Sequence, residues 1–142
     1  MATHISHSPA ETEALGAEWG RAAERGWIIG LSGDLGAGKT QLVKGIARGL
    51  GITQPLLSPT FALIHQYTSG RWPLFHLDLY RLETPMEIRS AGLEEYLYGP
   101  PGITVIEWIE HWPEPIQGWH RRVIITSPTE TERHIAYEDF GT

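Results

Sequence analysis

Residues 33–40 read Gly-Asp-Leu-Gly-Ala-Gly-Lys-Thr, which matches the phosphate-binding pattern G-x-x-x-x-G-K-[ST] at every fixed position. Gly33 and Gly38 allow a tight turn and a close approach of the backbone to a polyphosphate, because neither carries a Cβ atom. Lys39 can reach the β- and γ-phosphates, and the Thr40 hydroxyl can ligate Mg²⁺. This segment therefore predicts a nucleotide-binding loop.

The residues on either side of the loop fit this prediction. An apolar run at residues 27–32 is typical of a buried strand. Beyond the loop, apolar residues recur on one face of a helix that Gly51 can end, namely Leu42, Val43, Ile46, Ala47 and Leu50. A loop between this strand and this helix would place the positive end of the helix dipole against the phosphates.

The rest of the pattern predicts one α/β domain over residues 1–142, a small P-loop NTPase domain with a central mixed sheet flanked by helices. Capping boxes that begin at Ser8 and Thr84 each predict the start of a helix, and we expect the residues before Ser8 to be frayed. The expected elements are helices over residues 9–25 and 84–98, a hairpin of strands 61–67 and 72–77, a strand over 103–106, and paired strands over 121–126 and 133–137.

The composition argues against several kinds of partner. The net charge is −6 and the chain has only two lysines, Lys39 and Lys44, so we expect no basic surface for direct binding of DNA or RNA. No apolar run approaches the roughly 18 residues of a membrane span, so we expect no membrane contact. The chain has no cysteine, which fits a reducing compartment, and we expect a cytoplasmic protein.

Two acidic residues are candidates for work at a bound nucleotide, because hydrolysis needs an acidic group near Mg²⁺ and a group that orients water. Asp78 ends one apolar strand candidate and Glu107 ends another. One carboxylate could hold the metal while the other orients the attacking water. The residue pattern leaves open which carboxylate has which role. Thr60, within Ser-Pro-Thr, could sense the γ-phosphate or lie in an ordinary turn.

Four motifs in chain order resemble those of the TsaE (YjeE) family: Gly-Asp-Leu-Gly-Ala-Gly-Lys-Thr, Ser-Pro-Thr-Phe, His-Leu-Asp-Leu-Tyr-Arg-Leu and Glu-Trp. The resemblance runs from about Thr12 to Trp108 and implies a small bacterial P-loop ATPase, with ATP and Mg²⁺ as cofactors. It implies a role in forming threonylcarbamoyladenosine on tRNA, together with the TsaD and TsaB proteins. TsaD would transfer the threonylcarbamoyl group to the adenosine beside the anticodon, and tRNA would be reached only through this complex.

The resemblance also implies roles for the acidic and hydroxyl residues. Glu107 looks like the second protein ligand of Mg²⁺, beside Thr40. Asp78 looks like a residue of hydrolysis and switching, and Thr60 like a switch residue near the nucleotide. The candidate catalytic residues are Asp78, Lys39 and Glu107. ATP hydrolysis would reset the complex and so support multiple turnovers, and we expect the isolated chain to hydrolyse ATP slowly, since no arginine finger is identifiable.

Two further positions match the family outside the loop. Thr12 resembles a residue near the adenine, and Arg133 resembles a C-terminal contact to ATP. Many relatives carry two threonines after the loop lysine, whereas this chain has Thr40-Gln41. The expected cofactor-binding residues are Thr12, Gly33, Asp34, Leu35, Gly36, Ala37, Gly38, Lys39, Thr40, Gln41, Thr60 and Arg133.

Other functions are also compatible with a phosphate-binding loop. A small-molecule kinase needs an acceptor pocket and usually an arginine-bearing lid, for which residues 83–101 offer only Arg89. A non-catalytic adaptor would bind ATP only to set its own shape. A GTPase is disfavoured, because the chain contains no asparagine and therefore has no Asn-Lys-x-Asp motif.

Overall fold

The computed structural model describes residues 1–33, 38–56 and 63–141. Strands alternate with helices along most of the chain. The elements are β1 (Ala2–Ser6), α1 (Pro9–Ala22), β2 (Ile28–Gly33), α2 (Lys39–Gly49), β3 (Ile64–Tyr67), β4 (Leu74–Asp78), α3 (Pro85–Ser90), the 3₁₀ turn η1 (Glu94–Tyr96), β5 (Ile103–Glu107), the 3₁₀ turn η2 (Ile109–His111), β6 (His120–Thr126) and β7 (Arg133–Phe140).

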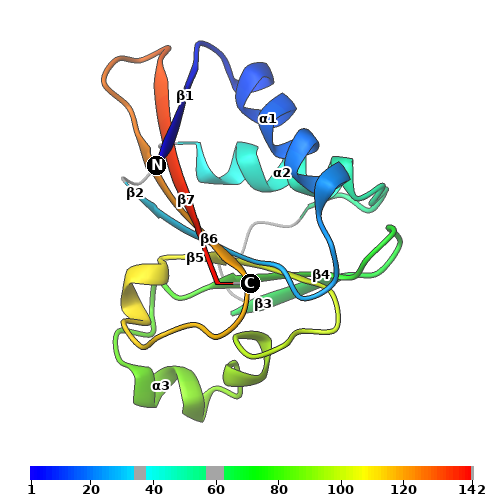
Figure 1. Cartoon of the computed structure of the whole chain (residues 1–142), viewed down its shortest axis with the longest axis vertical. Coiled ribbons are helices and arrows are strands. Elements are labelled where there is room, and N and C mark those ends of the chain that lie inside the picture. Colours follow the sequence, from blue (N-terminus) through cyan, green and yellow to red (C-terminus); the bar gives the residue numbers. More distant parts are fainter. Residues whose placement is uncertain (34–37, 57–62, 142) are drawn as a thin grey trace.

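The described strands form one seven-stranded sheet in the order β1-β7-β6-β2-β5-β4-β3 (Figure 1). The four central strands, β6, β2, β5 and β4, run parallel to one another. Both edges are antiparallel, with β3 beside β4, and with β7 and β1 beyond β6. The predicted α/β fold with a mixed sheet is therefore confirmed. Because the four central strands are parallel, their carboxyl ends lie together along one side of the sheet, at the ends of the strands.

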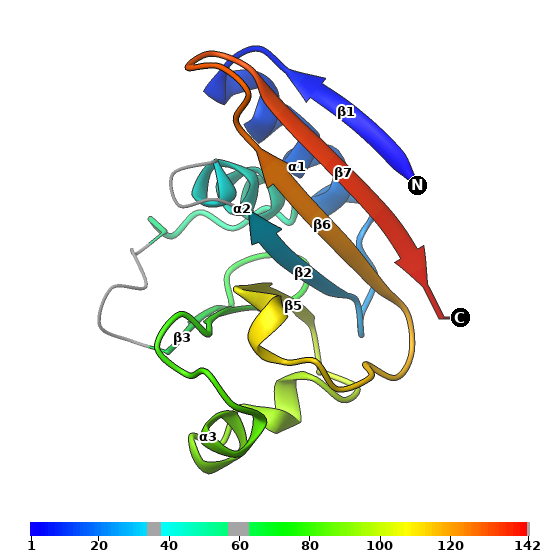
Figure 2. The same cartoon turned by 90° about the vertical axis from the view of Figure 1, so that its left-hand side faces the viewer.

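Helices cover both faces of the sheet and divide the apolar core in two. α1 and α2 lie on one face and α3 lies on the other (Figures 1 and 2). The core under α1 and α2 includes Leu42, Ile46, Ile29, Leu31 and Val105. The core on the α3 side includes Ile88, Trp112, Ile28, Leu77 and Ile106. All five apolar positions predicted for the helix after the loop are buried in the first core, so that prediction is confirmed.

Close packing between α1 and α2 depends on two pairs of glycines that the sequence argument did not use, Gly16 and Gly20 on α1 and Gly45 and Gly49 on α2. A Cβ atom at Gly45 would lie 2.1 Å from the carbonyl oxygen of Glu13, and one at Gly16 would lie 2.3 Å from that of Leu42. Both distances are far below van der Waals contact, so even alanine does not fit without separating the helices. The glycines therefore allow α1 and α2 to pack closely against each other.

The N-terminal residues are not frayed, and that expectation was wrong. Residues Ala2–Ser6 form β1, which pairs with β7 from Ala2 opposite Tyr137 to Ser6 opposite Arg133. The strand was missed because it is short and mostly polar, and its hydrogen-bonding partner lies at the far end of the chain. Pairing between strands so far apart in the sequence leaves no local periodicity that could predict it.

The first predicted helix begins as expected and ends early. The Ser8 side chain accepts a hydrogen bond from the backbone N–H of Glu11 at 3.1 Å, which confirms the predicted N-cap. The helix was predicted to reach Arg25, but it ends at Ala22, since Ala23 already has an extended ψ of 140°.

The helix predicted over residues 84–98 is much shorter in the structure. Its N-cap is confirmed, because the N–H of Glu87 donates to the Thr84 hydroxyl at 3.2 Å. The helix ends at Ser90, however, and Gly92 adopts a left-handed φ of 78°. A single 3₁₀ turn, η1, follows this break. Glycine in that conformation commonly ends helices, so Gly92 was a signal in the sequence that the helix would stop before Tyr98.

The remaining strand predictions hold within the described residues. β3 and β4 form the expected antiparallel hairpin, although residues 61 and 62 of the first predicted strand lie outside the described part of the chain. β5 matches its prediction, and β6 and β7 pair as expected, with β7 extending to Phe140. None of the helices in the described ranges is long and apolar enough to cross a membrane.

Candidate functional site

The predicted phosphate loop connects the end of β2 to the start of α2. Gly33 is the last residue of β2 and has φ 132°, and a Cβ atom there would lie 2.1 Å from the Ile125 carbonyl oxygen of β6. Gly38 is the N-cap of α2, with a left-handed φ of 99° and no side-chain cap on the first turn. The N–H groups of that turn are therefore available to an anion, as expected from the motif. Residues 34–37 lie outside the described chain.

Lys39 is the first residue of α2, and its side chain reaches back to the end of β2. Its Nζ donates to the Gly33 carbonyl oxygen at 3.1 Å and lies 4.2 Å from the centre of the Trp108 ring. The residue is only 5% exposed. The ammonium group is thus held in the gap between the ends of β2 and β5 by a carbonyl and a cation–π contact, both weak enough to be exchanged for phosphate.

The two predicted carboxylates lie side by side. Asp78 and Glu107 end the adjacent parallel strands β4 and β5 and are paired in register, and Leu31 of β2 pairs with Glu107 on its other side. Burial raises the pKa of the Asp78 carboxyl above its ordinary value of 3.8, and the Glu107 carboxylate raises it further. The N–H of Tyr80, which donates to Asp78 Oδ1 at 2.9 Å, opposes this shift. Two carboxylates repelling each other in a half-buried site favour a bound cation.

Glu107 has a partner that the sequence argument missed. Nε2 of His76 lies 2.6 Å from Oε2 of Glu107, and the two side chains are 2% and 8% exposed. His76 and Asp78 are two residues apart on β4, so their side chains lie on the same face of the sheet. The polar residues alternating with apolar ones in Leu74-Phe75-His76-Leu77-Asp78 were the signal that could have revealed this histidine.

Trp108 follows Glu107 in an unusual backbone conformation. Its φ of 63° is the one positive value at a non-glycine residue in the described part of the chain. A left-handed conformation costs a bulky residue roughly 1–2 kcal/mol. The ring packs on Tyr80 and His111, with centroids 5.1 and 5.6 Å away, and under the Lys39 ammonium. The strain is located where the loop lysine and the strand-end acids meet, which is typical of a functional site.

A pocket of about 420 Å³ opens beside the start of α2. Its walls come from the corner between β1 and α1, the first turn of α2 and the turn between β6 and β7. The lining residues are His7, Ser8, Pro9, Thr12, Gly38, Gln41, Glu130, Thr131 and Arg133. Three predicted nucleotide-contacting residues from distant parts of the chain, Thr12, Gln41 and Arg133, therefore share one cavity with the loop glycine.

The side chains of this pocket are held by neighbouring groups. The hydroxyls of Thr12 and Ser6 lie 2.7 Å apart, and Thr12 is 1% exposed, so it forms part of the pocket wall. A guanidinium nitrogen of Arg133 donates to the carbonyl oxygens of Thr129 and Glu132 at 3.1 and 3.0 Å. These contacts hold Thr12 against β1 and order the turn between β6 and β7.

The oxygen donors of the site fit Mg²⁺. Thr40 is exposed in the first turn of α2, and Glu107 keeps Oε1 outside its contact with His76. The described residues contain no cluster of three or more His, Cys, Asp or Glu side chains suited to a metal. Few protein ligands are typical of Mg²⁺ at a nucleotide, where phosphates and water complete the coordination shell.

The structure therefore brings together most of the predicted site within its described residues. Lys39, Asp78 and Glu107 meet at the edge of the sheet, whereas Thr12, Gln41 and Arg133 line the adjacent pocket. Five predicted nucleotide-binding residues lie outside the described chain: Asp34, Leu35, Gly36, Ala37 and Thr60.

Parallel central strands, a glycine-bounded loop leading into a helix, and acidic residues on adjacent strand ends define a P-loop protein of the NTPase type. The family model described as "Threonylcarbamoyl adenosine biosynthesis protein TsaE" matches residues 6–135. The chain belongs to the TsaE family.

Curated relatives agree with this family assignment. A "tRNA threonylcarbamoyladenosine biosynthesis protein TsaE" from Nostoc sp. is 56% identical over 102 residues, which cover 70% of this chain and 62% of that protein. The protein of the same name from Bacillus subtilis is 39% identical over 134 residues, covering 94% of this chain and 83% of the relative. The match to the Nostoc relative thus spans less than two thirds of its length.

A solved structure supports the fold. The crystal structure of Bacillus subtilis YdiB superposes with a TM-score of 0.80 at 33% identity, covering 96% of this chain and 83% of that chain.

Proposed function

We propose that this chain is the ATP-binding and ATP-hydrolysing subunit that supports multiple turnovers of threonylcarbamoyl transfer to the adenosine beside the anticodon of tRNA. The observation that carries the proposal is the meeting of Lys39, the first residue of α2, with Asp78 and Glu107 at the ends of β4 and β5. Membership in a family named for threonylcarbamoyladenosine biosynthesis supports the choice of reaction.

The triphosphate would lie along the loop and the first turn of α2. In that position Lys39 exchanges its contact with the Gly33 carbonyl for the β- and γ-phosphate oxygens, which are stronger acceptors because they are charged. The uncapped N–H groups of α2 bind the same phosphates. Gly38 keeps the backbone free of a side chain where the loop enters the helix.

Thr40 and Glu107 would hold Mg²⁺, which on binding neutralises charge on the β- and γ-phosphates. Asp78 would orient the attacking water, because it lies next to Glu107 and its pKa is raised by burial. A carboxylate with a raised pKa accepts a proton more readily than an ordinary aspartate. This division of roles follows the family resemblance and remains a proposal for each residue.

The base would occupy the pocket of about 420 Å³ beside α2. Thr12, Gln41 and Arg133 lie in its wall, where they would contact the adenine or its sugar. Asp34, Leu35, Gly36, Ala37 and Thr60 are proposed to contact the nucleotide as well.

The proposed partners are the TsaD and TsaB proteins, with tRNA reached only through them. The net charge of −6 and the scarcity of lysine support contacts through protein surfaces rather than direct RNA binding. A cytoplasmic location is part of the same proposal. Hydrolysis by the chain alone would be slow, since transition-state charge would be stabilised by a group that a partner supplies.

Reconstitution of the tRNA modification with and without this chain tests the proposal. With the chain and ATP present, threonylcarbamoyladenosine should accumulate over many cycles for each TsaD–TsaB complex. Without the chain, formation should stop after about one cycle. A yield unaffected by the chain, or a phosphorylated nucleoside or sugar when such acceptors are supplied, would replace the proposal with another function.

A further inference from the structure

Among the described ionisable side chains of the site, His76 is the most buried, at 2% exposed, and no motif gave it a role. It lies in the middle of β4, and its Nε2 is 2.6 Å from Oε2 of Glu107. Its other ring nitrogen, Nδ1, is buried with no hydrogen-bond partner among the described residues. A buried polar atom without a partner carries a cost, so the contact on the other side of the ring must be favourable enough to hold the ring there.

The two nitrogens together indicate how the proton is arranged. A carboxylate only accepts, so Nε2 donates to Glu107 in a charge-assisted hydrogen bond. Nδ1, which has no hydrogen-bond partner among the described residues, takes no part in this contact. The geometry therefore places a proton on Nε2, facing Glu107.

This donor has a specific effect on Glu107. It fixes Oε2 and leaves Oε1 for another ligand. Donor groups behind a metal-binding side chain orient it in many metal sites.

We propose that His76 is a positioning residue that holds the Glu107 carboxylate through Nε2–H, so that Oε1 faces the divalent cation of the bound nucleotide. This inference deepens the proposed function and rests on it for the presence of nucleotide and metal.

Mn²⁺ binding to the full chain tests this role, with the β,γ-imido analogue of ATP as nucleotide. Electron paramagnetic resonance reports Mn²⁺ affinity, and calorimetry in EDTA reports nucleotide affinity without metal. His76→Leu should weaken Mn²⁺ binding by at least about tenfold, which is typical of losing an outer-shell partner. Nucleotide affinity in EDTA should stay within about twofold, because the phosphate contacts of Lys39 are unaffected.

Two matched variants separate positioning from packing. His76→Gln keeps a neutral N–H donor of similar reach and should restore Mn²⁺ affinity to near that of the wild type. His65→Leu removes a histidine from β3 at the position paired with His76, and should leave both affinities unchanged. Thermal melting of each variant checks that it folds.

The outcomes distinguish this inference from the proposed function. If the wild-type chain binds no imido nucleotide, the proposed function fails. If the wild type binds nucleotide and Mn²⁺ but His76→Leu binds Mn²⁺ equally well, or His65→Leu loses as much, the positioning role is wrong. Should His76→Leu fail to fold, ¹⁵N NMR of the wild-type histidines decides, because a ring protonated on Nδ1 alone would overturn the role.

Discussion

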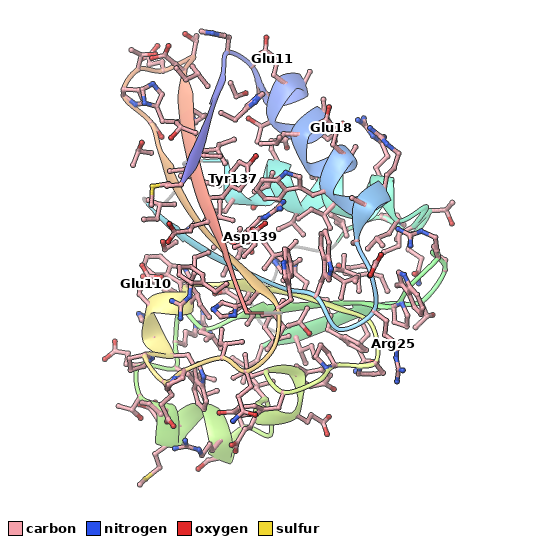
Figure 3. The ribbon with its side chains drawn as sticks, viewed as in Figure 1. Glu11, Glu18, Arg25, Glu110, Tyr137 and Asp139 are labelled. Carbon is pink, nitrogen blue, oxygen red and sulfur yellow. The ribbon has the colours of Figure 1, made fainter. Side chains whose placement is uncertain are left out.

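Two clusters of charged side chains in this molecule differ in how completely their charges are paired. In the first, Arg121 of β6 donates to Asp139 of β7 from Nε at 2.6 Å and from a terminal nitrogen at 2.9 Å. Four aromatic rings surround the guanidinium at 4.7–5.8 Å, those of Trp19, Trp27, Trp119 and Tyr137. Figure 3 labels Tyr137 and Asp139, which both come from β7.

The second cluster, at the ends of β4 and β5, is incompletely paired. Asp78 and Glu107 repel each other, Lys39 rests on a ring and a neutral carbonyl, and Trp108 is held in a strained conformation. The comparison indicates that the paired charges of β6 and β7 stabilise the fold, whereas the incompletely paired charges at the ends of β4 and β5 are suited to binding a ligand. Mutations should therefore separate stability from binding.

The largest expected effect is on nucleotide binding. Lys39→Ala should lower ATP affinity by at least about 100-fold, because it removes a charge-assisted contact to the phosphates. Isothermal titration calorimetry with Mg²⁺ measures it. Lys44→Ala, which removes the other lysine from an exposed position on α2, is the matched control and should bind as the wild type does. Equal losses from the two variants would contradict the specific role of Lys39.

Asp78→Asn should separate binding from hydrolysis. We expect the hydrolysis rate in the presence of partners to fall about 100-fold, since a carboxylate that accepts a proton is lost. ATP affinity should change by no more than about threefold. Single-turnover assays measure the rate. Asp139→Asn makes the same change in the paired cluster and should hydrolyse normally. If Asp78→Asn still supports many cycles of tRNA modification, ATP only sets the shape of the protein.

Arg121→Met should show the opposite pattern. It removes the bidentate ion pair and the cation–π contacts, and we expect unfolding free energy to fall by about 2 kcal/mol with ATP affinity unchanged. Urea unfolding measures this. Arg122→Met, at the next position of β6, is the control and should cost less than about 0.5 kcal/mol. A loss of ATP affinity in the folded Arg121→Met protein would mean that the two clusters are coupled.

The smallest effect concerns pH. Burial raises the pKa of Asp78 in the folded state, so the folded protein holds this proton more tightly than the unfolded chain does. The wild type should therefore lose stability relative to Asp78→Asn as the pH rises above the ordinary value of 3.8. Asp78→Asn should melt at a slightly higher temperature at pH 7, and the difference should vanish below the ordinary pKa of 3.8. A wild type that melts higher at pH 7 would contradict the sign of the shift.

Local patterns predicted the parts of this protein that depend on neighbours in the chain. The glycines and lysine of the loop, the buried face of α2 and the caps at Ser8 and Thr84 are set by contacts within a few residues, so short motifs reveal them. Asp78 and Glu107 could be proposed because each follows an apolar strand, and parallel strands end at the same edge.

Tertiary contacts decided the rest. The pairing of β1 with β7, the glycine contacts between α1 and α2 and the shared pocket of Thr12, Gln41 and Arg133 each join residues far apart in the sequence. The partner of Glu107 was decided in the same way, because only the register of β4 against β5 places His76 within 2.6 Å. The sequence by itself determined which chemical groups are present and the loop that presents them, since these depend on local conformation. The directions in which those groups face depend on strand order and helix packing, which only the folded chain establishes.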